Sequence, residues 1–375
     1  MPSKPSRQLT MVTPWPPQPS GIADYAKGLR DGLQAAGFNV DVFTNAETPD
    51  DVHHVGSVDE LITALSRYNR ILLQLGNHPF FHGYMAPITA ALGERCVVEL
   101  HDVRLDHMLP GLNYSGDPNF IERWLRANYG TQHIVSDARP ISDLICRQAS
   151  RVIVHSQYAA DWLRRLGITG ISVVDLSYDL DRIWAARNGE LVEEGIVHLG
   201  IFGTFQKSRQ IPLVLDALEI LHSHNVHGWH LHLVGRPCEG YQDLLSSLAA
   251  SPVRDRVTIH ESVPLERFLA LLRAMDVHVA LRSPTVGETS GVVVQGIALG
   301  VPTIVTNVGW YAELPEIVEK IPEQGGLFKL TAALYRHITD SDRRRRVSAE
   351  TKSFATEAYD IRSRAEEIGQ IIVNG

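Results

Sequence analysis

One stretch of the chain reads Arg282-Ser-Pro-Thr-Val-Gly-Glu288-Thr-Ser-Gly291-Val292, and it lies between an apolar run, Val277 to Leu281, and a helix-period segment, Gly291 to Leu299. A strand that leads through a polar loop into a helix is the repeating unit of a parallel sheet. Ligands of such sheets bind at the carboxyl ends of the strands. This stretch therefore predicts an α/β fold whose functional residues lie in the loops after the strands.

The same alternation of apolar runs and helical segments occurs twice along the chain. In the first half the predicted strands are Gln8 to Thr13, Val40 to Thr44, Arg70 to Gln74, Cys96 to Leu100 and Arg151 to His155, with a helix from Ile22 to Ala36 that ends at Gly37. In the second half the predicted elements are strand His198 to Phe202, helix Ile211 to Ser223, strands His230 to Val234 and Val257 to Ile259, helix Pro264 to Ala274, strand Val277 to Leu281, helix Gly291 to Leu299 and strand Pro302 to Thr306. The restart predicts two doubly wound, Rossmann-like domains with a ligand cleft between them.

The length of 375 residues agrees with two domains, because a single hydrophobic core stops growing well below that size. We expect an N-terminal domain over residues 1–180 and a C-terminal domain over residues 181–355. The junction is placed between Leu166 and Gly195, where the periodicity weakens. A last helical stretch, Thr351 to Val373, is expected to let residues 356–375 pack back on the N-terminal domain.

Composition and charge exclude several classes of protein. With 44% hydrophobic residues, 21% charged residues and no biased tract, the chain is predicted to be globular. The net charge of -8 and the scattered basic residues speak against nucleic acid as a partner. The start of the chain, Met1 to Thr13, contains only a short apolar stretch, which predicts neither a signal segment nor a membrane span.

Cysteine usage and the one charge run point to a cytoplasmic protein. Cys96, Cys146 and Cys238 are far apart and lack metal-ligand spacing, so they are predicted to be reduced, buried thiols. The run Arg343 to Arg346 favours a solvated helix surface, with weak peripheral contact to anionic lipid of the inner membrane face as the alternative.

The segment around Glu288 offers two interpretations. The amides of Gly291, Val292 and Val293 at a helix start form a site for phosphate, and Glu288 beside it is suited to hold sugar hydroxyls. Alternatively, Thr289 or Ser290 caps the helix and Glu288 interacts with its dipole.

The continuation of this segment resembles the donor-site signature of the group 1 (family 4) retaining glycosyltransferases of the GT-B fold. It runs through Gly300-Val-Pro302 to Gly309-Trp-Tyr-Ala-Glu313. The resemblance implies that Glu288 contacts the donor sugar and that the Gly291 and Val292 amides bind the diphosphate, with Ser290 also in the donor site. It also implies a second glutamate eight residues after Glu288 for the donor ribose. Gly296 stands there, and the spacing to Gly300 makes Gln295 the better match, without the charge.

A second loop, Gly203-Thr204-Phe-Gln-Lys207-Ser-Arg209, follows the first strand of the second domain. Cations there are able to neutralise the nucleoside diphosphate as it leaves. In the family an arginine directly follows the glycine and a lysine precedes the helix. Here Thr204 follows Gly203, and Lys207 and Arg209 are both candidates for the cation.

Loops of the first domain are predicted to line the acceptor side of the cleft. Ser20 and Gly21 open the first helix after a proline-rich loop, without the three-glycine spacing of a dinucleotide fingerprint, which disfavours hydride transfer. Asn77 and His78 follow another strand. The pair His101-Asp102 ends the strand Cys96 to Leu100, and the resemblance implies that His101 contacts the donor sugar.

The resemblance implies a metal-independent transfer of a hexose-type sugar from a nucleoside-diphosphate sugar to a hydroxyl with retention of configuration. No Asp-x-Asp motif lies at a convincing strand end, and we expect no metal and no cofactor other than the nucleotide-sugar co-substrate. The acceptor is a saccharide, a lipid-linked glycan or a small molecule, and the sequence does not set the oligomeric state. Two alternatives stay open: a catalytically inactive nucleotide-sugar-binding scaffold, suggested by Gln295 and Thr204, and a nucleotide-sugar epimerase or phosphorylase of the same fold.

Overall fold

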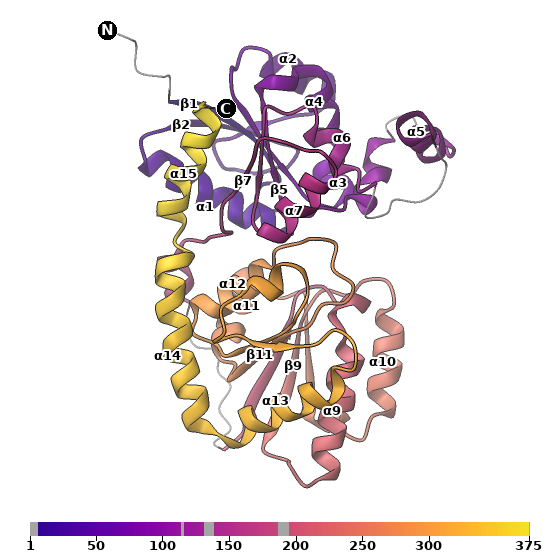
Figure 1. The fold of residues 1–375 in the computed structure, drawn as a ribbon, viewed down its shortest axis with the longest axis vertical. Helices are drawn as coiled ribbons and strands as arrows, with labels where there is room; N and C mark the ends of the chain where they lie inside the picture. The colour runs from indigo at the N-terminus through magenta and orange to yellow at the C-terminus, as the bar shows by residue number, and fades with distance from the viewer. Residues whose placement is uncertain (1–6, 114–115, 131–138, 187–194, 375) are drawn as a thin grey trace. The chain divides into compact units, whose positions relative to one another are not determined.

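The computed structural model describes residues 7–113, 116–130, 139–186 and 195–374. Residues 1–6 of the predicted start of the chain, and residues 187–194 of the predicted junction, lie outside that description. The chain divides into two compact units (Figure 1). The first consists of Met1–Tyr178, Val286–Thr289 and Ile361–Gly375, and the second of Asp179–Thr285 and Ser290–Asp360.

The first unit is built on a parallel sheet of seven strands in the order β3-β2-β1-β4-β5-β6-β7. The strands are β1 Gln8–Val12, β2 Asn39–Thr44, β3 His53–His54, β4 Ile71–Leu75, β5 Cys96–Leu100, β6 Arg151–Val154 and β7 Ile171–Val173. The helices are α1 Gly21–Ala35, α2 Val58–Leu65, α3 Pro79–His82, α4 Ala86–Leu92, α5 Phe120–Tyr129, α6 Ser142–Cys146, α7 Gln157–Arg165 and α15 Ile361–Asn374, with short 3-10 turns η1 Gly83–Met85, η2 Gly93–Arg95 and η3 Asp106–Leu112.

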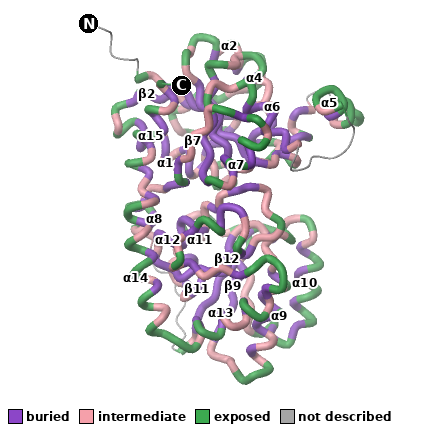
Figure 2. Tube along the Cα trace, in the orientation of Figure 1, coloured by how far each residue is buried: buried purple, intermediate pink, exposed green. Residues whose placement is uncertain are grey.

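The sheet of the first unit is buried on both faces. Leu9, Leu72 and Val97 pack on one face against α1 and α15, whereas Leu73 and Val98 point to the other. Helices cover both faces of all-parallel sheets, which explains why these strands read as near-continuous apolar runs. Figure 2 shows the buried residues concentrated along these strands.

The second unit has a parallel sheet of six strands in the order β10-β9-β8-β11-β12-β13. The strands are β8 Val197–Phe202, β9 Trp229–Gly235, β10 Val257–Glu261, β11 Val277–Ala280, β12 Thr303–Thr306 and β13 Glu319–Ile321. The helices are α8 Leu180–Trp184, α9 Ile211–Ser223, α10 Tyr241–Ala250, α11 Leu265–Arg273, α12 Gly291–Ala298, α13 Leu327–Thr339 and α14 Ser341–Ala358, with 3-10 turns η4 Lys207–Arg209, η5 Arg254–Arg256 and η6 Gly309–Glu313. The prediction of two doubly wound sheets is confirmed.

One face of the second sheet carries a row of histidines beside its apolar residues. Nδ1 of His198 lies 3.0 Å from Nε2 of His232, and Nδ1 of His232 lies 3.1 Å from Nε2 of His260. Burial lowers the pKa of His232 to about 3, and the neighbouring histidines add to this. The same face packs Phe202 and Val234 against residues of α11.

The C-terminal stretch differs from its prediction as one helix from Thr351 to Val373. Tyr359 and Asp360 interrupt it, and the chain passes from α14 in the second unit to α15 in the first. In the first unit α15 packs along α1, where a Cβ on Gly32 would lie 2.8 Å from Cβ of Ala365 (Figure 1). The small residue at position 32 lets these two helices approach closely.

The run Arg343 to Arg346 lies in α14, but two of its members are not simply solvated. Arg343 pairs with Glu319 and Arg344 pairs with Asp276, whereas Arg345 pairs with Asp342 at the surface. Burial alone would raise the pKa of Glu319, but hydrogen bonds from His337 and Arg336 lower it to about 2. The prediction of a plain solvated surface is therefore wrong for Arg343 and Arg344.

The three cysteines are free thiols. Cys96 and Cys146 are buried as predicted, whereas Cys238 is half-buried. Within the described ranges, no helix is both long enough and apolar enough to cross a bilayer.

Candidate functional site

Residues of the candidate site lie at the carboxyl edges of the two sheets, and each edge is described by itself. In the second unit the strand order reverses between β8 and β11, so the loops after these two strands meet at the switch point. Hydrogen bonds join the two loops: Ser283 N donates to the Ser208 carbonyl at 2.8 Å, and Gln210 Nε2 donates to the Ser283 carbonyl at 3.1 Å. The two segments that the sequence singled out in this domain are thus brought together.

The two cationic candidates of the loop after β8, Lys207 and Arg209, have different surroundings in the structure. Arg209 folds back on its own loop, and its Nε donates to the Thr204 carbonyl at 2.7 Å. Gly203 has φ +103, and a Cβ there would collide with the Arg209 guanidinium. Lys207 is exposed, and its Cε would lie 3.1 Å from a Cβ on Gly240. Arg209 is therefore held at the end of β8, whereas Lys207 extends over the surface of the loop.

Arg282 is a cation at this edge to which the sequence interpretation gave no role. It directly follows the strand segment Val277 to Leu281, and its Nη1 donates to Ser208 Oγ at 2.8 Å, which ties it to the first loop. Its Nε lies 3.4 Å from the hydroxyl of Tyr311. The signal in the sequence was its place at the start of the loop between strand and helix.

The start of α12 is capped as well as suited to phosphate. Ser290 is the N-cap residue, and both its hydroxyl and its carbonyl accept from Val293 N, at 3.4 and 3.1 Å. The expectation that the Val293 amide is available to phosphate is therefore wrong. The amides of Gly291 and Val292 make no hydrogen bond to any residue in the described part of the chain.

Inside α12, the structure distinguishes Gln295 from Gly296. A Cβ on Gly296 would lie 3.0 Å from Nδ1 of His278, so this position faces the sheet and has no room for a glutamate. Gln295 is 9% exposed, and its amide makes no hydrogen bond to a described residue. The geometry agrees with Gln295, and not Gly296, as the residue able to meet a ligand.

Glu288 packs with the first unit, although the sequence placed it inside the second domain. Val286 O accepts from Arg104 N at 3.0 Å, and a Cβ on Gly287 would lie 2.7 Å from Val103. Gly287 has φ +80, so this close approach requires glycine. Glu288 is 8% exposed, and its Oε2 accepts from Val286 N at 2.8 Å.

In the first unit the loops after β1, β4 and β5 carry the predicted residues. Ser20 caps α1, and its hydroxyl accepts from Ile22 N at 3.2 Å. A Cβ on Gly21 would meet nothing within 4 Å, so open space lies beside this position. His78, at the start of α3, stacks on Phe81 with ring centroids 4.1 Å apart, and burial lowers its pKa.

Asn77 and Asp102 connect two of these loops. Asn77 N donates to Asp102 Oδ2 at 2.9 Å, and the Asn77 side chain donates to Asp106 Oδ1 at 3.0 Å while its Oδ1 accepts from His107 N at 2.8 Å. Both ends of the Asn77 amide are thus used to hold η3 in place. This arrangement favours a structural role for Asn77 over contact with an acceptor.

His101 follows β5 and is 8% exposed. Burial holds the pKa of His101 well below its usual range, and the neighbouring His155 and His82 lower it further. The imidazole is therefore neutral at pH 7. The ring contacts Tyr25 and His155, both of which the sequence interpretation left without a role.

Glu99 is a further residue that sequence reasoning missed. It is wholly buried, accepts from the Tyr25 hydroxyl at 2.5 Å and from Gln74 Nε2 at 2.7 Å, and lies 3.6 Å from Nε2 of His155. The signal was a lone carboxylate inside the apolar strand Cys96 to Leu100. Buried carboxylates are rare unless they are hydrogen-bonded, so such a residue indicates a cluster of buried polar side chains around it.

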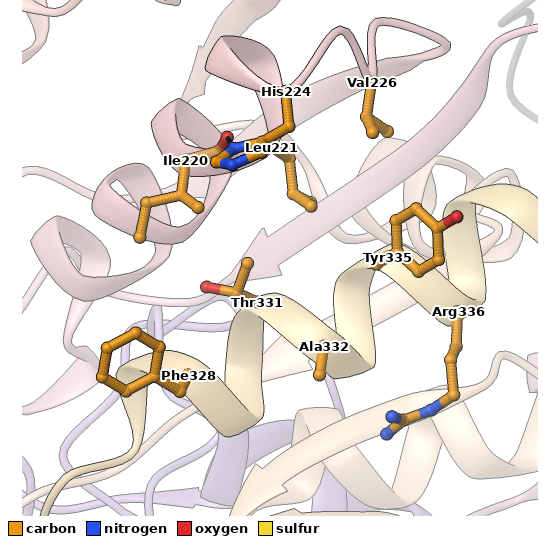
Figure 3. Close-up of a pocket in the computed structure, with 9 residues that line it drawn as sticks. All are labelled: Ile220, Leu221, His224, Val226, Phe328, Thr331, Ala332, Tyr335 and Arg336. Carbon is orange, nitrogen blue, oxygen red and sulfur yellow. Dashed lines mark hydrogen bonds between the residues drawn. The ribbon is translucent and has the colours of Figure 1, made fainter.

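A cavity of about 440 Å³ lies elsewhere in the second unit, between α9 and α13 (Figure 3). Its lining is mostly apolar and consists of Ile220, Leu221, His224, Val226, Phe328, Thr331, Ala332, Tyr335 and Arg336. It touches the C-terminal end of α9, which lies at the amino edge of the sheet, because a helix that follows a parallel strand runs back along it. This cavity is therefore separate from the candidate site.

Comparisons with known proteins agree with this geometry. Residues 196–340 match the family model described as Glycosyl transferases group 1, which covers most of the second unit. No curated protein matches the sequence. The matched part of the chain is a glycosyltransferase domain.

Solved structures resemble the chain over nearly its full length. Sucrose-phosphate synthase from Thermosynechococcus elongatus has a TM-score of 0.72 at 15% identity and covers 97% of this chain and 98% of its own. Anabaena Alr3699/HepE in complex with UDP-glucose has a TM-score of 0.71 at 16% identity, with 98% and 100% covered. A trehalose-6-phosphate protein from E. coli bound with UDP-2-fluoro glucose has a TM-score of 0.69 at 12% identity, with 98% and 99% covered. The fold of the chain is GT-B.

Proposed function

We propose that this chain is a retaining glycosyltransferase of the group 1 (family 4) kind, which moves a hexose-type sugar from a nucleoside-diphosphate sugar to a hydroxyl. The observation that carries the proposal is the switch point of the second unit. There Arg209, Arg282 and the loop with Lys207 adjoin the segment that opens α12, inside the region matched by the glycosyltransferase model.

The cations and amides of this edge suit a diphosphate. As the glycosidic bond breaks, negative charge builds on the leaving phosphate, and preorganised donors stabilise it without reorganising. Arg209 is already fixed by the Thr204 carbonyl, and the amides of Gly291 and Val292 make no bond to a described residue. Arg209 is the principal cation of this proposal, with Lys207 at the exposed side and Gln295 at the ribose.

Glu288 and His101 are proposed to hold the donor sugar. Both are nine-tenths buried, and both follow strands of parallel sheets. A carboxylate is a strong acceptor for sugar hydroxyls, and a neutral imidazole can both donate and accept. Ser20 and Gly21 are proposed to lie on the acceptor side together with His78, and open space lies beside Gly21.

UDP-glucose is the first donor to test. Anabaena HepE was solved with UDP-glucose, and the E. coli protein with UDP-2-fluoro glucose. At 16% and 12% identity these structures guide the choice of donor only. The acceptor is proposed to be a saccharide, a lipid-linked glycan or a small molecule with a free hydroxyl.

We further propose a metal-independent reaction in which the acceptor hydroxyl attacks from the face that the nucleotide leaves. The new bond forms between the acceptor oxygen and the anomeric carbon while the bond from that carbon to the phosphate oxygen breaks. The acceptor's proton goes to the departing phosphate. Arg209 and the α12 amides take the place of a metal ion in neutralising that phosphate.

A catalytically inactive nucleotide-sugar-binding protein is the second candidate. Two observations favour it: Gln295 stands where the family places a charged ribose ligand, and Thr204 stands where it places an arginine. A nucleotide-sugar epimerase is the other alternative. It would convert the donor without releasing free nucleoside diphosphate.

The test combines a thermal-shift screen with an assay of nucleoside diphosphate release. UDP, GDP, ADP and dTDP sugars are compared with and without saccharide acceptors, in EDTA and in Mg²⁺. We expect one donor to raise the thermal midpoint. We also expect that donor to release diphosphate faster with acceptor, equally well in EDTA. Binding without release would favour the inactive protein, and a changed sugar without release would favour the epimerase.

A further inference from the structure

A buried polar cluster surrounds Glu99 at the carboxyl edge of the first sheet. One carboxylate oxygen accepts from the Tyr25 hydroxyl at 2.5 Å, and the other accepts from Gln74 Nε2 at 2.7 Å. Glu99, Gln74 and Tyr25 are buried. A carboxylate without water needs such donors, because leaving it without them is costly.

His155, which directly follows a neighbouring strand, lies beside the same carboxylate. Its Nδ1 donates to the Val174 carbonyl at 2.9 Å, and its Nε2 lies 3.6 Å from Glu99 Oε1. The carbonyl fixes the tautomer and the plane of the ring, so the other nitrogen points at Glu99. His155 is 1% exposed and has little room to rotate.

His101 lies against both of these rings. Its ring meets Tyr25 edge-on at 5.2 Å between centroids and an interplanar angle of 77°, and it meets His155 at 4.7 Å. Its Nε2 is buried and has no hydrogen-bond partner among the residues that the structure describes. The orientation of the His101 ring therefore depends on its contacts with the two neighbouring rings.

We propose that Glu99 is a positioning residue for His101, because its carboxylate accepts the hydrogen bond that fixes Tyr25, one of the two rings that the His101 imidazole contacts. This inference rests on the proposed function, in which His101 contacts the donor sugar. Glu99 itself acts only through Tyr25. The fold brings Tyr25 of α1 and His155, the residue after β6, to the end of β5, so the arrangement belongs to this chain's own packing.

Losing the hydrogen bond between Tyr25 and Glu99 is expected to lower turnover more than donor binding, because His101 is then less well positioned. A misplacement of about 1 Å in a reacting group costs on the order of 100-fold in rate. Removing the Tyr25 hydroxyl leaves the donor's other contacts in place. The expected signature is a fall in kcat with little change in the donor KM.

The chain offers a matched control for this experiment. Tyr129 donates to Asp143 Oδ1 at 2.6 Å in the same unit, so Tyr25→Phe and Tyr129→Phe each remove one hydroxyl from a tyrosine–carboxylate hydrogen bond. We expect Tyr129→Phe to lower the thermal midpoint at least as much as Tyr25→Phe, because the Tyr129 hydroxyl also accepts from Ile141 N at 3.1 Å. Only Tyr25→Phe is expected to lower kcat of transfer, by about 10-fold or more, with the donor KM changed less than about threefold.

A spectroscopic measurement reports on the environment of the His101 ring without any substrate. The Cε1–H resonance of His101, assigned through His101→Gln, is followed by NMR in the intact protein. We expect it to shift in Tyr25→Phe and in Glu99→Gln but not in Tyr129→Phe. If Glu99→Gln fails to fold, Tyr25→Phe still tests the same contact.

Three results would overturn the proposal: Tyr25→Phe with the kcat of Tyr129→Phe, a His101 resonance that stays unchanged, or one equivalent of zinc in the purified protein. Zinc is included because ligand atoms of Glu99, His101 and His155 lie within 4.8 Å of one another, and a metal would then orient the rings. A wild-type protein without transferase activity would instead refute the proposed function, and the NMR measurement would still test whether Glu99 positions the His101 ring.

Discussion

The carboxyl edges of the two sheets follow the same strand order but differ in chemistry. The edge of the second unit is cationic, with Arg209, Arg282 and Lys207 in two loops bonded to each other. The edge of the first unit carries neutral His101 over the buried carboxylate of Glu99. The shared topology places both sites at strand ends, and the side chains decide what each can bind. A cationic edge fits a diphosphate, and a neutral imidazole fits an uncharged sugar.

Glu288 provides the strongest test of this division, because its carboxylate is proposed to act on the sugar and not on the diphosphate. Glu288→Ala is expected to lower kcat by about 100-fold to 1000-fold, the range for removing a group that stabilises the transition state. Binding of the nucleoside diphosphate alone should change little. Steady-state transfer and calorimetry with the free diphosphate measure the two effects.

Glu316→Ala is the matched control for that variant, since Glu316 has a 99% exposed side chain and pairs only loosely with Lys320. It should transfer sugar at the wild-type rate. Near-normal transfer by Glu288→Ala would contradict the proposal that this segment binds the donor sugar. Because Glu288 Oε2 also accepts from Val286 N, thermal unfolding of both variants must accompany the assay.

Arg209 and Lys207 test the cationic edge, and the structure ranks them. Arg209→Ala is expected to cost about 100-fold in kcat, because a preorganised donor is lost from the developing charge. Lys207→Ala is expected to cost about 10-fold or less, since an exposed ammonium is screened by salt. Both are measured as kcat/KM for the donor at low and at high ionic strength.

The opposite ranking would assign the diphosphate to Lys207. It would mean that the loop moves on donor binding, so that the bond from Arg209 to the Thr204 carbonyl is not kept. A double variant distinguishes the cases. If both cations touch one phosphate, their effects should not add.

The sequence predicted the strands and helices from local pattern, and these are nearly as observed. Helix Ile211 to Ser223 has the predicted bounds, and strand Cys96 to Leu100 does as well. The short strands His53–His54, Ile171–Val173 and Glu319–Ile321 were missed, because two or three residues carry no periodicity. Longer helices were missed as well, among them α10 Tyr241–Ala250 and α13 Leu327–Thr339, so local pattern found the strands of four residues or more but not every helix.

Contacts between distant segments could not be read from the chain. Val286 to Thr289 belong with the first unit because Val286 bonds to Arg104, about half the chain away. Glu99 was hidden in a strand, and its partners Tyr25 and His155 come from other elements. The family resemblance supplied His101 and Glu288, but it could not supply the neighbours that hold them.

Acid should destabilise the second unit through its buried neutral histidines. Burial lowers the pKa of His232 and of His278 to about 3. A folded pKa below the unfolded value near 6.5 means that protons favour the unfolded chain. Stability is then complete above about pH 6.5 and is lost toward pH 3, by about 1.4 kcal/mol per pH unit for each group.

His232→Gln removes one such group and keeps donors and acceptors for His198 and His260. We expect its thermal midpoint to fall less between pH 7.5 and pH 5 than that of the wild type. His224→Gln, at an exposed position of the same unit, should keep the wild-type dependence. Identical dependence in all three proteins would contradict the prediction.

Gln295 gives the smallest expected effect and refines the donor side of the comparison. An ionised acceptor makes stronger hydrogen bonds to hydroxyls than an amide does. Gln295→Glu is therefore expected to lower the donor KM by about threefold to tenfold, which corresponds to about 1 kcal/mol. Gln295→Ala should raise that KM by a similar factor. Gly296→Glu is expected to destabilise the unit instead, because a Cβ there already lies 3.0 Å from His278 Nδ1. If neither Gln295 variant changes the donor KM, the ribose does not bind at Gln295. The first turn of α12 would then bind only the phosphate.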